Sequence, residues 1–298
     1  MEKTIVNGIS INVYPHISPI AIAQIAHGME EHQGRYKAFA EFLNSHGFTV
    51  VTADMRGHGA NTPTEELGWF ADRDGWKLLC EDQLNVREFI SDRFPELPVF
   101  LIAHSMGSII SRVILQHDST KYDKVIFTGY PCWQKGTGTG IFLANLLQAI
   151  AGSKAKSKLL NKMSTGVFNH SVESPETDFD WISYDRENVR KFINDPLCGF
   201  GFSISALRDL FTLVRLMHDF TRCENVNSEL PILLLSGADD PCTGGEKGRA
   251  ETISTLRKSG FKHISTIEYA EMRHEILNEA GRALVFRDIA EFLNPGDL

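Results

Sequence analysis

The chain has 298 residues, of which 42% are hydrophobic and 23% charged, a balance typical of a globular protein with a large buried core. It carries 30 lysine and arginine residues against 38 aspartate and glutamate residues, so its formal net charge is −8. An acidic balance argues against a nucleic-acid-binding protein, which would need a basic face, and no nucleic-acid partner is predicted.

Taken in order, the chain predicts alternating strands and helices. Residues Thr4–Val13 form a hairpin around Asn7-Gly8, a dipeptide typical of tight β-turns. Six apolar strands are then expected over residues 19–28, 48–54, 99–105, 124–129, 231–240 and 263–270. Helices are expected over residues 35–46, 75–94, 106–117, 248–258 and 279–293. This alternation predicts an α/β fold whose mostly parallel sheet is covered by helices on both faces.

One segment, residues 133–222, breaks the alternation after the strand at 124–129, which is the sixth strand when the two hairpin strands are counted. It opens with GTGTG at residues 136–140, which we interpret as a flexible hinge, and contains a candidate helix over residues 141–150 but no convincing strand. We expect a largely helical cap at 133–222, inserted between core segments 1–132 and 223–298. Such an insertion would cover the carboxyl edge of the sheet, where ligands bind in open α/β folds.

The cysteines and the N-terminus bear on the cellular compartment. Five cysteines are scattered without a C-x-x-C pair or zinc-ligand spacing, which favours free thiols and no metal site. The first residues, MEKTIVNGIS, lack the features of a signal peptide, and no apolar run approaches the ~18 residues of a spanning helix. We therefore expect a soluble, cytoplasmic protein.

The stretch AHSMG, at residues 103–107, lies between a predicted strand and a predicted helix. It matches the nucleophile elbow G-x-S-x-G except that Ala103 replaces the first glycine. Ser105 is therefore a candidate nucleophile, with the alternative that its side chain merely caps the helix. His104 is expected to pack beside the elbow.

A serine nucleophile needs a base and an orienting carboxylate, and in this fold they follow it in the order serine, acid, histidine. Two aspartates, Asp239 and Asp240, end the strand at 231–240, and only one of them can face the base. Among the eleven histidines, His274 alone follows the last strand. The oxyanion donors are expected to be the backbone amides of Met106 and of Met29.

Several blocks of the sequence resemble one family. HGMEEHQGRY resembles the H-G-x-x-E-H-x-x-R-Y block of the monoacylglycerol lipase and lysophospholipase branch of the α/β-hydrolases, also labelled serine aminopeptidase S33-like. ADMRGHG, AHSMGS and MRHEILNE match further blocks, and FDWISYD and NDPLCGF resemble cap motifs of bacterial members. SGADDP matches the acid motif G-x-x-D, which places the acid on Asp240. The resemblance implies an α/β-hydrolase fold and the triad Ser105, Asp240 and His274. Cys242 stands where similar sequences tend to have valine, and we expect it to be a small buried residue.

The cap sequence bears on the substrate. Apolar residues of its first helix, including Phe142 and Leu146, are followed by Lys154, Lys156, Lys158 and Lys162. We expect either a helix packed on the core with a solvated lysine run, or a lid that lines an acyl tunnel and touches a membrane surface transiently. Gly28, His104, Phe142 and Leu146 are the candidate substrate contacts.

The predicted function is hydrolysis of carboxylic esters of single-acyl-chain lipids, of the monoacylglycerol or lysophospholipid type, without metal or organic cofactor. The first alternative is an esterase or peptidase that acts on small non-lipid esters or aminoacyl substrates, for which Glu30 or Glu31 could anchor an amine. A non-catalytic ligand receptor on a hydrolase scaffold is the second alternative.

Overall fold

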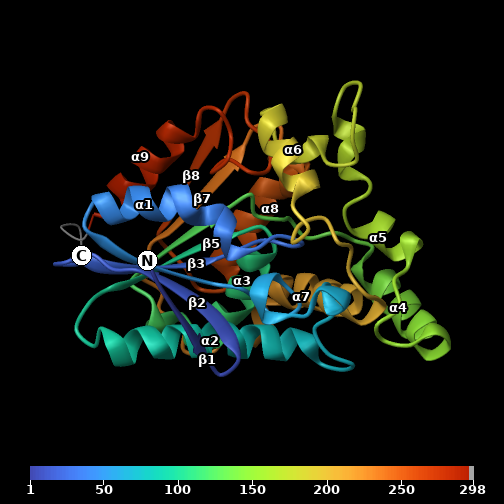
Figure 1. The fold of residues 1–298 in the computed structure, drawn as a ribbon, viewed down its shortest axis with the longest axis horizontal. Helices are drawn as coiled ribbons and strands as arrows, with labels where there is room; N and C mark the ends of the chain where they lie inside the picture. Colours follow the sequence, from blue (N-terminus) through green and yellow to red (C-terminus); the bar gives the residue numbers. More distant parts are fainter. Residues whose placement is uncertain (295–298) are drawn as a thin grey trace.

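The computed structural model of the chain describes residues 1–294 (Figure 1). An eight-stranded sheet with the order β1-β2-β4-β3-β5-β6-β7-β8 lies at the centre of these residues. Strand β2 is antiparallel to both of its neighbours, and the remaining adjacent pairs are parallel. The strands are β1 (Glu2–Val6), β2 (Ile9–Tyr14), β3 (Ala21–Ala26), β4 (Phe48–Ala53), β5 (Val99–His104), β6 (Lys124–Thr128), β7 (Ile232–Gly237) and β8 (Ile264–Tyr269). The predicted fold class, a mostly parallel sheet between helices, is confirmed.

The α-helices of the described residues lie between and after these strands. They are α1 (Lys37–Ser45), α2 (Gly75–Arg93), α3 (Met106–Asp118), α4 (Thr137–Ala151), α5 (Lys158–Ser164), α6 (Arg186–Asn194), α7 (Ile204–His218), α8 (Gly245–Lys258) and α9 (Arg282–Phe292). The last helix begins three residues later than predicted, because Glu279 is held in the preceding loop, where it accepts hydrogen bonds from the amides of Tyr184 and Arg273.

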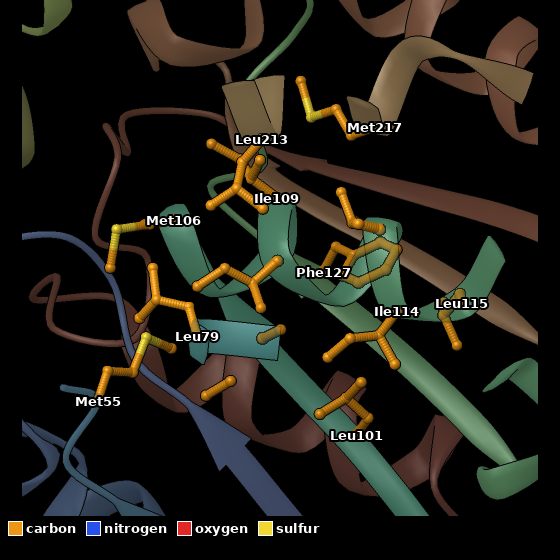
Figure 2. Close-up of a cluster of buried hydrophobic side chains, with 14 of the residues drawn as sticks. Met55, Leu79, Leu101, Met106, Ile109, Ile114, Leu115, Phe127, Leu213 and Met217 are labelled. Atoms are coloured by element: carbon orange, nitrogen blue, oxygen red, sulfur yellow. The ribbon is translucent and has the colours of Figure 1, made fainter. Parts of the chain in front are cut away.

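Alternating side chains of each buried strand divide between the two faces of the sheet. Phe100 and Ile102 of β5 pack with α1 and α9, whereas Leu101 and Ala103 pack with α2, α3 and α7. Figure 2 shows part of the second cluster, in which side chains of β5 and β6 meet those of α2, α3 and α7. Because the five central strands β3 to β7 are covered on both faces, most of them read in sequence as continuous apolar runs.

The parallel register brings four loops to one edge of the sheet. Ala26 at the end of β3 pairs with Ala103 of β5, and Gly237 at the end of β7 pairs with Tyr269 of β8. The loops that begin at His27, at Ser105, at Ala238 and at Ala270 therefore leave the sheet on the same side. These four loops carry the residues that the sequence singled out for chemistry.

Along the chain, helices α4 to α7 follow β6 and precede β7, as expected of a cap inserted after the sixth strand (Figure 1). The last of them also belongs to the main core, since Leu207 and Leu213 of α7 are fully buried in the cluster that contains α2 and α3. The limits of the cap, 133 and 222, remain a prediction.

The GTGTG stretch does not form an irregular linker, contrary to the expectation, because α4 begins at Thr137 within it. Gly140 lies against the ring of Phe211 on α7, and a Cβ atom on Gly140 would come within 2.8 Å of that ring. The absence of a side chain at this position lets α4 and α7 pack closely, so the glycine is needed for helix packing.

Candidate active site

Ser105 occupies a tight turn between β5 and α3. Its backbone has φ 49° and ψ −117°, in the positive-φ region that a residue with a side chain adopts only where its surroundings impose it. The Ser105 amide donates a hydrogen bond to the Thr128 carbonyl on the neighbouring strand, at 3.0 Å. The Ser105 side chain makes no capping hydrogen bond to α3, so the helix-capping alternative is wrong.

Close packing at this turn depends on two glycines. A Cβ atom on Gly107 would lie 2.5 Å from the Ala26 carbonyl oxygen, so the first turn of α3 rests directly on the end of β3. A Cβ atom on Gly28 would lie 3.1 Å from the Ser105 Cβ and 2.8 Å from a carboxylate oxygen of Glu31. The glycines therefore let the backbone after β3 approach the serine.

The carboxylate and the imidazole form a buried pair. His274 Nδ1 lies 3.1 Å and 3.0 Å from the two carboxylate oxygens of Asp240, and both side chains are almost fully buried. Asp240 also accepts a hydrogen bond from the Cys242 amide at 2.9 Å. Asp239 points elsewhere and accepts a hydrogen bond from the Tyr184 hydroxyl. The structure thus brings Asp240, and not Asp239, to His274.

Electrostatics distinguish the two histidines of the site. Burial is the largest single effect on the pKa of His274 and would lower it, but Asp240, with smaller contributions from Glu275 and Glu31, raises the pKa above 6.5 overall. His104, whose ring lies 4.7 Å from that of His274, has no such partner, and burial lowers its pKa to about 4. Its Nδ1 lies 3.0 Å from the Thr128 hydroxyl. His104 is therefore a neutral neighbour of the elbow, and His274 is the basic one.

A cavity of about 150 Å³ lies over this edge of the sheet and is lined by Ser105, His274 and their neighbours. Both expected oxyanion residues, Met29 and Met106, line it, as do Gly28 and His104. The Met106 amide belongs to the first turn of α3, where a helix has no carbonyl acceptor of its own for the N–H. Most of the remaining wall is apolar and comes from Ile109, Phe168, Phe179, Trp181, Ile182, Phe192, Leu210, Phe211 and Val214.

The two cap residues expected at the substrate do not line this cavity. Phe142 is 67% exposed and Leu146 is 50% exposed. Helix α4 packs on α7 through its opposite side, where Gly140 and Ala144 are buried, and this arrangement turns Phe142 and Leu146 outward. Sequence spacing identified an apolar stripe but did not show which stripe would face the core.

A buried network beside the site includes Arg35 and Glu275, to which sequence reasoning assigned no role. Arg35 donates hydrogen bonds to Glu31 at 2.9 Å and to both carboxylate oxygens of Glu275 at 2.5 and 2.7 Å. Glu31 in turn accepts hydrogen bonds from the Gly28 amide and the Tyr36 hydroxyl. Burial alone would raise the pKa of Glu31, but the surrounding groups, of which Arg35 has the largest effect, together outweigh burial and lower the pKa to about 2. The network ties the loop after β3 to the loop that carries His274, and the family blocks HGMEEHQGRY and MRHEILNE contain its members.

Within residues 1–294, two groups of three side chains have ligand atoms close enough to share a metal ion. They are Asp240, Cys242 and His274, and His32, Asp195 and Cys198. In both groups the histidine nitrogen is already within hydrogen-bond distance of the carboxylate, at about 3.0 Å. The histidine and the carboxylate of each group therefore already pair with one another. All five cysteines are free, and Cys242 is buried as expected.

Comparison with known proteins gives the family. A model of the serine aminopeptidase S33 family matches residues 17–281. The monoglyceride lipase of Mus musculus is 26% identical over 281 residues, which is 89% of this chain and 82% of that protein. Phospholipase YtpA of Bacillus subtilis is 26% identical over 278 residues, 92% of this chain and 95% of that protein.

Solved structures agree with this result. A thermostable carboxyl esterase from Bacillus coagulans, solved with glycerol, superimposes with a TM-score of 0.89 at 26% identity, covering 96% of this chain and 93% of the esterase. A soluble variant of the monoglyceride lipase of Saccharomyces cerevisiae superimposes with a TM-score of 0.73 at 16% identity, which shows the shared fold. The chain therefore belongs to the serine aminopeptidase S33 family of α/β-hydrolases, as its motifs predicted, and is a serine ester hydrolase.

Proposed function

We propose that the protein hydrolyses carboxylic esters of single-acyl-chain lipids, of the monoacylglycerol or lysophospholipid type, through an acyl-enzyme on Ser105. The observation that carries the proposal is the buried Asp240–His274 pair, which shares a cavity with a serine held in a strained turn. A serine hydroxyl is a poor nucleophile at neutral pH unless a positioned base accepts its proton.

In the proposed mechanism, Ser105 Oγ attacks the ester carbonyl while His274 Nε2 accepts the hydroxyl proton. Asp240 accepts the Nδ1–H of His274 and stabilises the imidazolium that forms. The imidazolium then returns the proton to the departing alkoxide, which leaves as an alcohol. Water attacks the acyl-enzyme with His274 as base again, which releases the fatty acid and restores Ser105.

The tetrahedral intermediates carry a negative charge that needs hydrogen-bond donors. We assign this role to the backbone amides of Met29 and Met106, which flank the cavity from the loop after β3 and from the start of α3. Loss of one such donor typically costs roughly 10²–10³-fold in kcat. Glu31 supports the first of these loops through its hydrogen bond to the Gly28 amide.

An acyl chain suits the cavity because its wall is mainly apolar. The relatives named monoglyceride lipase and phospholipase support a lipid ester as the substrate. An aminoacyl substrate would need a free carboxylate for its amine. Glu31 does not offer one because Arg35 already pairs with it, so Glu30 is the one expected anchor that is left in the cavity wall. Small esters remain the second candidate, because the cavity also admits a short acyl group.

The decisive experiment compares Ser105→Ala with Ser111→Ala. Ser111 lies on α3, the helix that follows Ser105, and its buried hydroxyl has no hydrogen-bond partner among the described residues, so it is a matched control. We expect the wild type and Ser111→Ala to react with a fluorophosphonate probe and to hydrolyse p-nitrophenyl esters, and Ser105→Ala to do neither. A series of p-nitrophenyl esters of increasing chain length, run beside aminoacyl anilides, then separates lipase from peptidase. Ester hydrolysis retained in Ser105→Ala would contradict the mechanism, and an inert wild type would favour a non-catalytic receptor.

A transient contact between the cap and a lipid surface is the second part of the proposal. Phe142, Leu146 and Ile150 recur every four residues along α4 and are at least half exposed, so they form one outward apolar stripe. Lys158 and Lys162 on the adjacent α5 form no ion pair among the described residues, whereas Lys154 pairs with Glu66. No helix of the described residues has the length and apolar character needed to cross a bilayer.

Replacing Phe142, Leu146 and Ile150 together by serine should therefore weaken flotation with anionic vesicles. The soluble ester p-nitrophenyl butyrate should be hydrolysed as before, because these side chains lie outside the cavity. Ile17→Ser is the matched control, since Ile17 is fully exposed and lies away from the cap. Unchanged vesicle binding by the triple variant would contradict a membrane contact through α4.

A further inference from the structure

Glu30 is a buried acidic residue of the cavity wall to which the mechanism gives no role. It follows Met29, and its φ of 54° places a residue with a side chain in a region that favours glycine. Its amide donates to His58 Nε2, and its carbonyl accepts from the Gly199 amide. One carboxylate oxygen accepts a hydrogen bond from the Gly201 amide at 3.1 Å. The backbone is thus held on both sides, and the side chain is only 8% exposed.

Among the described residues, Glu30 lacks the cationic partner that the other acidic residues of the cavity share. Of the three glutamates that line the cavity, Glu31 and Glu275 share Arg35, whereas Glu30 forms no ion pair within residues 1–294. Burial raises the pKa of Glu30 to about 7, against weaker opposing effects of the Gly201 amide and of Lys156. The Lys156 ammonium donates instead to the Phe200 carbonyl.

The imidazole beside Glu30 supplies no positive charge either. Burial lowers the pKa of His58 to about 3, so this ring is neutral at physiological pH. Among the described residues, no lysine or arginine lines the cavity. A phosphate group in a protein is normally held by such side chains, through charge-assisted hydrogen bonds. A phosphate in this cavity would meet no lysine or arginine and would face a carboxyl group in surroundings of low polarity.

In a single-acyl-chain lipid, only the head group offers polar atoms to a carboxyl group, because the acyl chain is hydrocarbon. We infer that Glu30 is a specificity-determining residue, which selects esters whose head group carries hydroxyl or ammonium functions and no negative charge, and which excludes phosphate-bearing head groups. This inference rests on the proposed function. It restricts the proposed substrates to esters whose leaving alcohol is neutral or cationic.

The test uses three esters of the same acyl chain, assayed below their critical micelle concentrations. They are 1-decanoylglycerol, decanoylcholine and 1-decanoylglycerol 3-phosphate, which carry a neutral, a cationic and an anionic head group. In the wild type, kcat/KM for the phosphate ester should be at least about tenfold below that for the neutral ester. A tenfold ratio corresponds to the free energy of the weakest hydrogen bonds that involve a charged group. Equal or higher kcat/KM for the phosphate ester would overturn the inference.

The variant Glu30→Gln removes the charge and keeps the amide oxygen that can accept the Gly201 hydrogen bond. It should reduce the discrimination against the phosphate ester by about tenfold and lower the preference for decanoylcholine over decanoylglycerol. Glu173→Gln is the matched control, because it removes one charge from an exposed position of the cap and should leave both ratios unchanged. If Glu30 serves only to hold the Gly199–Gly201 segment, Glu30→Gln will leave the ratios as they are, and the inference fails.

Two further measurements keep the outcomes separate. Should Glu30→Gln fold poorly, inhibition of the wild type by decyltrimethylammonium and by decyl phosphate replaces it. The cation should inhibit at a concentration at least about tenfold lower, and the reverse order would overturn the inference. Hydrolysis of p-nitrophenyl butyrate by the wild type and its loss in Ser105→Ala report on the proposed function alone, so failure of that function is distinguishable from failure of the role of Glu30.

Discussion

Replacing Arg35 by methionine should destabilise the fold and disturb the site at the same time. The Arg35 guanidinium is 9% exposed and makes two hydrogen bonds to Glu275, one to Glu31 and one to Asn188 on α6. Methionine is similar in volume to the arginine stem but cannot donate any of these bonds. The variant therefore leaves two carboxylates buried without their cation.

The expected loss in the free energy of unfolding follows from the burial of these ion pairs. Removing one partner of a buried ion pair costs about 3–5 kcal/mol, because the remaining charge is uncompensated. At roughly 2 cal/mol/K per residue, a chain of this length has an unfolding entropy near 0.6 kcal/mol/K, so the loss corresponds to a fall in Tm of about 5–8 °C. Glu31 would also hold the Gly28 amide less firmly, so the loop that carries the proposed oxyanion donor should become less ordered.

Differential scanning calorimetry of Arg35→Met at pH 7 measures the first effect, and the rate of labelling by a fluorophosphonate measures the second. Arg190→Ala is the matched control, because Arg190 pairs with Glu187 on the surface of α6, where such pairs contribute about 0–1 kcal/mol. Slower labelling and a lower Tm are expected only for Arg35→Met. A Tm loss no greater than that of Arg190→Ala would refute the reasoning that the network is a stabilising link between the two loops.

Three further outcomes follow from the site. Asp240→Asn should lower kcat by roughly 10³–10⁴-fold, because asparagine no longer accepts the Nδ1–H and the imidazole loses its correct tautomer, and kcat within tenfold of wild type would exclude the assigned acid. Gly107→Ala should abolish activity or folding, since its Cβ would lie 2.5 Å from the Ala26 carbonyl oxygen, and a fully active variant would contradict the close packing at the elbow. The kcat/KM for a soluble ester should fall as pH drops through the pKa of His274, because the protonated ring cannot act as a base. Asp240 raises that pKa, so the titration of the ring, followed by NMR, should shift to lower pH in Asp240→Asn, and an unmoved titration would argue against the coupling.

Local sequence patterns were sufficient to predict the strands and turns that position the site. The apolar runs of the strands, the Asn7-Gly8 turn and the AHSMG elbow each depend on neighbours in sequence, and each lies where it was expected. The order of Ser105, Asp240 and His274 along the chain also follows from the fold that these elements build. Such features are readable because periodicity and turn chemistry act over a few residues.

Other features depended on contacts between distant residues. The sequence places Asp239 and Asp240 at the end of the same strand, and position in the strand alone does not separate them, although the acid motif G-x-x-D pointed to Asp240. The packing of the histidine loop brings His274 to Asp240 and leaves Asp239 with Tyr184. The apolar residues of α4 were evident, but the close approach of Gly140 to α7 decided that Phe142 would point outward.

By itself, then, the sequence determined the strands, the helices outside the cap and the types of residue at the carboxyl edge of the sheet. The tertiary structure decided which carboxylates are neutralised: Glu31 and Glu275 share Arg35, although 240 residues separate Arg35 from Glu275, whereas Glu30, next to Glu31 in the chain, has no cation among the described residues. The physical reason is that the charge state of a buried carboxylate depends on the groups within a few ångströms of it in space, and the folded chain alone brings those groups together.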